Sequence, residues 1–265
     1  MFDVNRDYMG ERTIWMFWTE SNEMSATRRS CVEQVREMNK DCNVYLVTHK
    51  EISELQEISE LPNLHKGFQY LSAMFKSDYL RCYFMHHFGG GYSDIKRTST
   101  SWLEYFNKIE DGEDLYAVGY REASANEVAR LENCRLDPKE SKYCRDFTLN
   151  EAGDAWSSEH VRTNWQKLIG NCSYICKKKT PFTQDWWNAL NEKMDGYYEE
   201  LKENPAKHPM DSWGDHGIHP KPDPPTKFPI PWAGICGNIF HPLTLKYTEY
   251  IDGSFPYPDL GGGYR

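Results

Sequence analysis

The alternation of short apolar segments with a helical segment near the amino terminus constrains this fold most strongly. Residues 13–19 (TIWMFWT) form a short apolar and aromatic run, which is typical of a buried strand. Residues 25–39 follow, with Ser25 placed to cap a helix whose apolar side chains recur at helical spacing. Residues 43–49 (NVYLVTH) predict a second strand. A strand, a helix and a strand in this order predict a βαβ unit and an α/β fold with a mainly parallel central sheet flanked by helices.

The alternation continues after residue 50, and the pattern weakens between 121 and 170, where we expect a mixed insertion. Residues 205–231 are rich in Pro, His and Asp, which predicts a long irregular loop. An ordered segment is expected again from residue 233. The elements expected in between are a short helix (52–58), a helix (69–87), a strand from Tyr92, a helix (102–109), a strand (115–120), a strand with a basic turn (172–179) and a long helix (181–204).

Charge and hydropathy exclude two classes of protein. The chain has 265 residues, with 31 Lys and Arg against 40 Asp and Glu, so its net charge of -9 argues against broad nucleic-acid binding. No apolar run is long enough to span a membrane, and the polar residues 1–12 do not resemble a secretory signal. We therefore expect a cytoplasmic protein. Its eight cysteines are expected to be free and mostly buried, with a zinc pair at Cys172 and Cys176 as a weaker alternative.

The stretch from Phe88 to Arg97 (FGGGYSDIKR) carries the strongest functional signal. Gly89 is placed to end the preceding helix, and Gly90 and Gly91 are expected to let the backbone pass close to that helix. Asp94 then follows a short strand. Ligands of open α/β sheets lie beyond the carboxyl ends of the strands, so Asp94 is well placed to hold a metal or a ligand hydroxyl. Read alone, it would be an ordinary turn residue.

The preceding helix presents a second pair of charges. Asp78 and Arg81 lie three residues apart and therefore share a helix face. Taken alone, they would be an exposed helix pair of small energetic value. Their position just before the glycines makes a shared site with Asp94 the better interpretation.

The combined stretch from Ser77 to Lys96 (SDYLRCYFMHHFGGGYSDIK) resembles the Ser-Asp-x-x-Arg…Gly-Gly-x-Tyr-x-Asp-x-Asp core of DXD-containing glycosyltransferases. The nearest groups are glycosyltransferase family 32, the capsular polysaccharide synthesis transferases, the yeast initiating mannosyltransferases and the glucosylating domain of large clostridial toxins. Looser similarity covers residues 13–48, 169–190 and 233–240, in the same order as in the family. Together these segments touch about half of the chain.

The resemblance implies a single GT-A domain over residues 1–265. Residues 12–120 would bind the nucleotide sugar, and 121–265 would form the acceptor side with a closing loop. The implied activity is retaining transfer of a hexose, with a UDP-hexose favoured over GDP-mannose, to a glycan, polysaccharide or glycoprotein. The resemblance also implies front-face transfer, and no second carboxylate stands out in the sequence as a covalent nucleophile. The residues implied in donor binding are Trp18, which would stack on the base, Thr19, Asp78, Arg81, Tyr92, Asp94, Asn171 and Trp213, with Trp232 as a second candidate for the closing tryptophan.

Lys96 departs from the family pattern, because it occupies the place of the second Asp. A charged lysine cannot ligate a divalent metal. In one interpretation, which we favour from the sequence, Mn²⁺ or Mg²⁺ still binds through Asp94, the diphosphate and a later side chain. In the other, Lys96 itself neutralises the leaving diphosphate. The catalytic candidates are thus Asp94, Arg81 and Lys96, and the further metal-ligand candidates are Asp215, His216 and His241.

Two other functions compete with this one. The His and Asp residues between 208 and 219 offer a metal-dependent hydrolase site, although their spacing matches no standard signature. A catalytically weakened, transferase-like glycan-binding protein is the second alternative, since Lys96 replaces an Asp. Slow hydrolysis of nucleotide sugars would distinguish a transferase from both of these alternatives.

Overall fold

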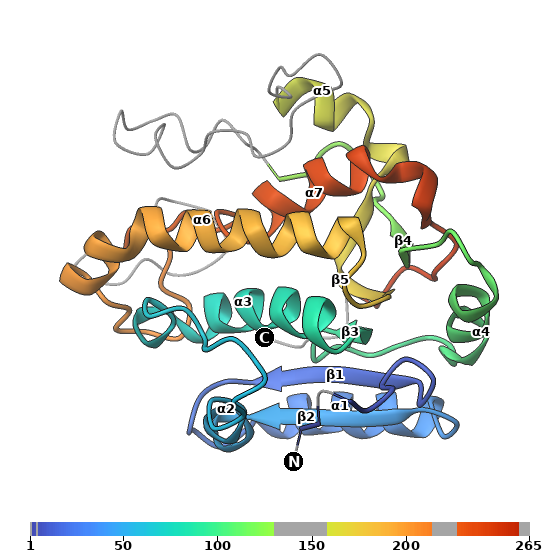
Figure 1. The fold of residues 1–265 in the computed structure, drawn as a ribbon, viewed down its shortest axis with the longest axis horizontal. Helices are drawn as coiled ribbons and strands as arrows, with labels where there is room; N and C mark the ends of the chain where they lie inside the picture. The colour runs from blue at the N-terminus through green and yellow to red at the C-terminus, as the bar shows by residue number, and fades with distance from the viewer. Residues whose placement is uncertain (1, 4, 130–157, 214–226, 260–265) are drawn as a thin grey trace.

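The computed structural model describes residues 2, 3, 5–129, 158–213 and 227–259, and its centre is a β-sheet (Figure 1). Within these residues the sheet has six strands in the order β2-β1-β3-β5-β4-β6. Five of them run in one direction, and β5 alone is antiparallel to both of its neighbours. The strands are β1 (Thr13–Trp18), β2 (Asn43–Thr48), β3 (Gly90–Ser93), β4 (Ala117–Arg121), β5 (Ile169–Cys176) and β6 (Ile251–Asp252).

The sheet confirms the predicted α/β class with a mainly parallel sheet, and it adds the direction of β5, which was not predicted. The amino-terminal part, β2-β1-β3, is parallel as predicted, with Ile14 paired to both Val44 and Gly91. The reversed β5 between β3 and β4 makes the sheet mixed. An apolar run has the same side-chain alternation whichever way the strand runs, so sequence pattern does not encode this direction.

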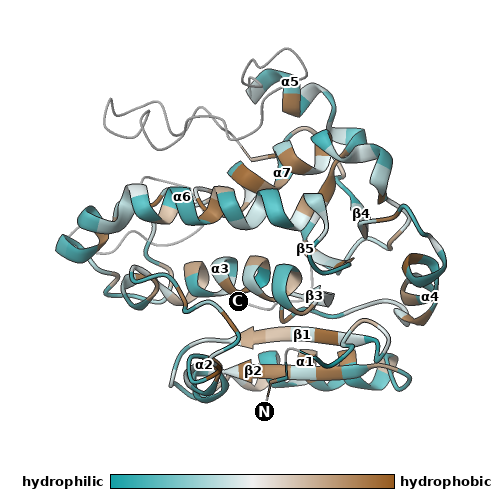
Figure 2. Ribbon diagram, in the orientation of Figure 1, coloured by the Kyte–Doolittle hydropathy of each residue, from teal (hydrophilic) through white to brown (hydrophobic). Residues whose placement is uncertain are grey.

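Helices cover both faces of the sheet. Trp15 and Phe17 of β1 pack into a core with three helices, α3 (Ala73–His87), α6 (Pro181–Glu203) and α7 (Gly237–Lys246), which are seen together in Figure 1. Ile14 and Met16 point to the opposite face, which α1 (Ala26–Met38) and α4 (Leu103–Asp111) cover. Figure 2 shows the hydrophobic colours along β1 and α7 and a mixture along α6. The alternation along β1 thus builds a three-layer arrangement.

Capping residues set the helix starts. The Ser25 side chain accepts the Arg28 N–H at the start of α1, as predicted, and Thr180 accepts the Thr183 N–H ahead of Pro181 in α6. Thr48 and Glu51 form a capping box that starts α2 (His49–Leu55) three residues earlier than the sequence predicted. The remaining helical segments are η1 (Phe68–Tyr70), α5 (Ser158–Thr163), η4 (Trp165–Lys167) and η5 (Thr248–Tyr250).

The three glycines between α3 and β3 have roles that differ in part from the expectation. Gly89 ends α3 with a φ of 72°, as predicted, and Gly90 has a φ of 94°. A Cβ on Gly90 would lie 2.7 Å from the Thr13 carbonyl oxygen, and one on Gly91 would lie 2.7 Å from the Trp102 ring. The close approach is therefore to β1 and to the residue before α4, rather than to Asp78 and Arg81, and β3 starts at Gly90 instead of Tyr92.

The carboxyl-terminal half contains both expected and unexpected structure. β5 begins at Ile169, three residues before the predicted strand, and Gly196 does not interrupt α6. The described parts of the predicted loop, 205–213 and 227–231, carry one isolated bridge, between Trp213 and Pro231. Helices in the described part of the chain are all too short or too polar to cross a membrane.

Candidate functional site

The carboxyl-terminal edge of the parallel strands gathers the predicted donor-binding residues. Trp18 ends β1 and Asp94 directly follows β3, and these strands are parallel neighbours, so both residues emerge at the same edge of the sheet. Helix α3 packs against the same two strands and brings Asp78 and Arg81 to this edge. β5 adds Asn171, because the Asp94 N–H donates to the carbonyl of the adjacent Cys172, at 2.8 Å.

Four ionisable side chains form one connected group, which we call the charged cluster: Asp78, Arg81, Asp94 and Lys96. Arg81 lies 2.8 Å from an Asp78 oxygen and 3.5 Å from Asp94 Oδ1, and Lys96 Nζ lies 2.9 Å from Asp94 Oδ2. The side chains of Asp78, Arg81 and Lys96 are no more than 9% exposed, whereas Asp94 keeps 23% exposure. The cluster is thus a buried ionic network whose most accessible member is Asp94.

Neighbouring groups fix the geometry of the cluster. Tyr92 donates its hydroxyl to Asp94 Oδ1 at 2.5 Å, and its ring lies under the Arg81 guanidinium, 4.5 Å from the ring centroid. Arg81 also donates to the Asn171 carbonyl oxygen at 2.6 Å. Lys96 Nζ lies 3.2 Å from the Cys172 sulfur. Each charged side chain is therefore held in place from at least two sides.

The pKa values of the two carboxylates in the cluster are shifted in opposite directions. Burial raises the pKa of Asp78 to about 6, with Arg81 opposing the shift and Asp94 reinforcing it. Burial would also raise the pKa of Asp94, but Lys96 and Arg81 outweigh it and hold that pKa at about 2. Asp94 is therefore the fixed anion of the site at neutral pH, and Asp78 is the carboxylate closest to protonation.

Two cysteines line the cluster as neutral thiols. Cys172 contacts Lys96, and Cys236, just before α7, contacts the Asn171 amide at 3.3 Å and hydrogen-bonds Asp78. Burial, together with Asp94, raises the pKa of Cys172 to about 11, and burial raises the pKa of Cys236 above its usual range. A thiol in this state is a poor nucleophile, so the site does not offer cysteine-based catalysis. The six cysteines in the described ranges are all free, as predicted.

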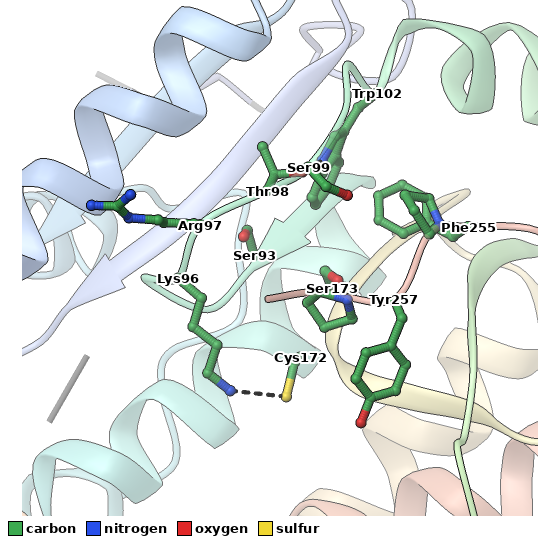
Figure 3. Close-up of a pocket in the computed structure, with 12 residues that line it drawn as sticks. Ser93, Lys96, Arg97, Thr98, Ser99, Trp102, Cys172, Ser173, Phe255 and Tyr257 are labelled. Atoms are coloured by element: carbon green, nitrogen blue, oxygen red, sulfur yellow. Dashed lines mark hydrogen bonds between the residues drawn. The ribbon is translucent and has the colours of Figure 1, made fainter. Parts of the chain in front are cut away.

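A small pocket opens beside Lys96. Lys96 and Cys172 share its wall with Trp102 and Tyr257, and Figure 3 shows the ammonium group directed at the Cys172 sulfur, while Arg97 points elsewhere. The segment that contains Tyr257 runs back along the loop after β3, where Arg97 and Asp259 form an isolated antiparallel bridge. The contact between Lys96 and Cys172 therefore lies in the wall of this small pocket.

The other predicted donor-binding residues have the following contacts. Trp18 is half-buried, and its indole N–H donates to the Asn22 carbonyl at 2.9 Å. The Thr19 hydroxyl donates to the Ala73 carbonyl at 3.0 Å, which ties the end of β1 to the start of α3. Trp213, the candidate closing tryptophan, donates its backbone N–H to the Ile230 carbonyl. Its role as a lid residue stays a prediction.

His241, the carboxyl-terminal metal-ligand candidate that the structure describes, contacts Glu122 and Ala129 instead of the charged cluster. His241 Nε2 lies 3.0 Å from a Glu122 oxygen, and its Nδ1 accepts the Ala129 N–H at 3.0 Å. Both ring nitrogens are thus engaged in a buried pair that sequence reasoning missed. Asp215 and His216 lie outside the described residues.

The residues around Asp94 do not fit a divalent cation. Its two oxygens are engaged by Lys96, Arg81 and Tyr92, and two of these partners are cations. In the described ranges, no three His, Cys, Asp or Glu side chains are placed to hold a metal together. Mn²⁺ and Mg²⁺ prefer oxygen ligands, and neither oxygen of Asp94 is without a partner in this arrangement. The second interpretation of Lys96 is therefore the one that the geometry favours.

One residue of the alternative hydrolase site that the structure describes, Asp211, has a structural role. Asp211 is buried, and its carboxylate accepts the backbone N–H groups of Lys207 and His208 at 2.6 and 3.0 Å. This carboxylate therefore fixes a turn. His219, like Asp215 and His216, lies outside the described residues.

The sequence carried no signal for Cys172, Cys236 or Glu122 as neighbours of functional groups. Buried cysteines are common in any core, and a single Glu after a strand is uninformative. The register of β5 against β3 and the approach of α7 bring the two thiols to the cluster, and both are tertiary features.

Comparisons with known proteins show similarity to solved structures and to a protein family. A solved structure described as "PaToxG Glycosyltransferase" is 13% identical, over 75% of this chain and 74% of that chain, with a TM-score of 0.34. No curated protein matches the sequence. Residues 2–128, which contain β1 to β4 and the whole charged cluster, match the sequence model of a family described as "Capsular polysaccharide synthesis protein". The amino-terminal part of the chain is thus similar to the capsular polysaccharide synthesis family.

Proposed function

We propose that this protein is a glycosyltransferase that moves a hexose from a nucleotide-diphosphate sugar, with a UDP-hexose favoured, to a glycan or polysaccharide acceptor. The observation that carries the proposal is the charged cluster at the carboxyl-terminal edge of the parallel strands. This edge is where ligands of α/β sheets bind, and two cations fixed there suit an anionic leaving group. The family match over residues 2–128 supports a role in polysaccharide synthesis.

Each residue of the site has a role in this proposal. Trp18, half-buried beyond β1, stacks on the nucleotide base. Arg81 and Lys96 face the diphosphate and stabilise the charge that develops on it as the bond between the anomeric carbon and the diphosphate oxygen breaks. Asp78 and Asn171 contact sugar hydroxyls, and Tyr92 keeps Asp94 and Arg81 in place.

Retention of anomeric configuration is part of the proposal. Both carboxylates of the cluster are paired with cations, which makes them poor candidates for a covalent nucleophile. A front-face reaction does not need one, because the departing phosphate oxygen accepts the proton of the acceptor hydroxyl. The new bond joins that hydroxyl oxygen to the anomeric carbon, and the nucleoside diphosphate leaves.

A panel of nucleotide sugars tests the proposal. The purified protein is incubated with UDP-glucose, UDP-galactose and GDP-mannose, each with Mn²⁺ and with a chelator, and thermal stability and donor hydrolysis are measured. At least one donor is expected to raise Tm, because a ligand that binds only the native state stabilises it. It should also be hydrolysed slowly to a sugar whose initial anomeric configuration, measured by NMR, matches the donor.

The outcomes separate the alternatives. If no donor changes Tm or is hydrolysed, the proposal is wrong. Binding of glycans without turnover of any donor would favour the glycan-binding alternative. Initial release of the opposite anomer would retain the transferase and reject the retaining mechanism.

A further inference from the structure

We propose that the donor diphosphate is bound without a divalent cation, and that the Lys96 ammonium group, held by Asp94, takes the place of the metal. This inference rests on the proposed function and specifies how its site recognises a nucleoside diphosphate. It concerns Asp94, Lys96 and Arg81, all of which the structure describes. Its tests measure nucleotide and metal binding directly, so they do not depend on knowing the acceptor.

The first argument is the coordination of Asp94. Lys96 Nζ lies 2.9 Å from Oδ2, while Tyr92 donates to Oδ1 at 2.5 Å and Arg81 lies 3.5 Å from the same oxygen. A divalent ion bound to either oxygen would have to displace one of these partners. It would then lie within a few ångströms of an ammonium or guanidinium group in a buried environment, where repulsion is poorly screened.

The second argument is the charge balance. Asp78 and Asp94 supply two negative charges, and Arg81 and Lys96 supply two positive charges within ion-pair distance. Two neighbouring positive charges repel a divalent cation and offset the attraction of the carboxylates. The described cluster therefore has no net negative charge to attract a metal ion, and Arg81 and Lys96 are the groups in it that can contact an anion.

The third argument is the way in which Lys96 is held. An ammonium group has three donors, and one of them is directed at the Cys172 sulfur at 3.2 Å. A neutral thiol is a weak acceptor, so a phosphate oxygen can replace it while Asp94 keeps the ammonium group in position. Lys96 and Cys172 both line a small pocket, so this side of the ammonium group is where we expect the phosphate oxygen to enter (Figure 3).

The first experiment measures nucleotide and metal binding by the wild-type protein. UDP and GDP are titrated by calorimetry in a chelator and again in Mn²⁺, and free Mn²⁺ is followed by electron paramagnetic resonance. We expect the preferred nucleotide to bind with the same Kd, within about twofold, in both conditions. No stoichiometric Mn²⁺ binding is expected in the absence of nucleotide.

Two Lys96 variants and a matched control complete the design. Lys96→Met should weaken nucleoside diphosphate binding by about tenfold or more while leaving the affinity for the uncharged nucleoside unchanged. Lys96→Asp should acquire Mn²⁺ binding and require Mn²⁺ for nucleotide binding. The control, Lys108→Met, removes a lysine that lies 2.8 Å from Asp252 at a more exposed position, and it should bind nucleotide like the wild type.

The outcomes distinguish this inference from the proposed function. Nucleotide binding by the wild type that is at least about tenfold tighter in Mn²⁺, or stoichiometric Mn²⁺ binding, would overturn the inference and leave the transferase intact. Equal loss of nucleoside and nucleoside diphosphate affinity in Lys96→Met would also overturn it. If neither nucleotide binds under any condition, both proposals fail. Should a variant not fold, the wild-type comparison decides.

Discussion

The charged cluster and the Glu122–His241 pair are both buried and polar, but they differ in the number of charged side chains and in exposure to solvent. In the pair, the His241 ring satisfies Glu122 with one nitrogen and the Ala129 N–H with the other, and both side chains are at most 6% exposed. The cluster holds four charged side chains, each within ion-pair distance of another, and Asp94 keeps 23% exposure. A sealed, mutually satisfied pair stabilises a fold, whereas a partly open network of fixed charges is suited to bind and stabilise a charged ligand.

The largest expected effect is on activity and tests the cluster. Asp94→Asn removes the anion that positions Lys96 and Arg81 while it keeps the size of the side chain. We expect transfer to fall by about a hundredfold or more, as is typical when a preorganised charge stabiliser is lost. The measurement is kcat/KM for the preferred donor, with circular dichroism as the control for folding. Activity within about fivefold of the wild type would contradict the proposed role of the cluster.

The next effect is on stability and tests the pair. His241→Ala leaves the buried Glu122 carboxylate and the partly buried Ala129 N–H without their partner. We expect the free energy of unfolding to fall by about 2 to 4 kcal/mol. Urea unfolding measures this loss. A loss below about 1 kcal/mol would show that the Glu122–His241 pair does not stabilise the fold as expected.

The smallest effect is a pH dependence that contrasts the two aspartates of the cluster. The pKa of Asp78 is raised from 3.8 to about 6, so the folded state holds the proton more tightly. Its stabilising contribution is full below pH 3.8 and is lost as the pH rises through about 6, by on the order of 1 to 3 kcal/mol. The lowered pKa of Asp94 acts with the opposite sign, and its contribution is lost only as the pH falls through about 2.

The measurement for this contrast is urea unfolding at several pH values between 4 and 7. Asp78→Asn should remove the decline in stability across this range, since the amide does not titrate. An identical slope in the wild type and the variant would mean that another group is responsible.

The parts of the site that were predictable are local in sequence. The i, i+3 spacing placed Asp78 and Arg81 on one face of α3, and the short strand before Asp94 placed that residue at a ligand-binding edge. Lys96 stood out as a departure from the family pattern, yet its partner was not predictable. A side chain two residues beyond Asp94 can point to either side, and the N–H of Asp94 bound to β5 is one of the contacts that orients this loop.

The parts that were not predictable depend on long-range packing. His241 was a metal-ligand candidate in the sequence because histidine is a common ligand type. In the structure, α7 approaches the end of β4, and Glu122 and Ala129 occupy both ring nitrogens of His241. Cys172 and Cys236 lie at the cluster for the same reason. The direction of β5 was also hidden, since side-chain alternation is identical in parallel and antiparallel strands.

The sequence by itself determined the alternation of strands and helices, the capped helix starts, the turn at Gly89 and the presence of three charged residues near one sheet edge. These follow from local spacing and backbone preference. The tertiary structure decided that Lys96 lies on Asp94, with Arg81 and Tyr92 on its other oxygen. Burial enforces this pairing, because a charge removed from water is stable only with a fixed partner. The resulting arrangement of partners favours an anion over a metal ion at this site.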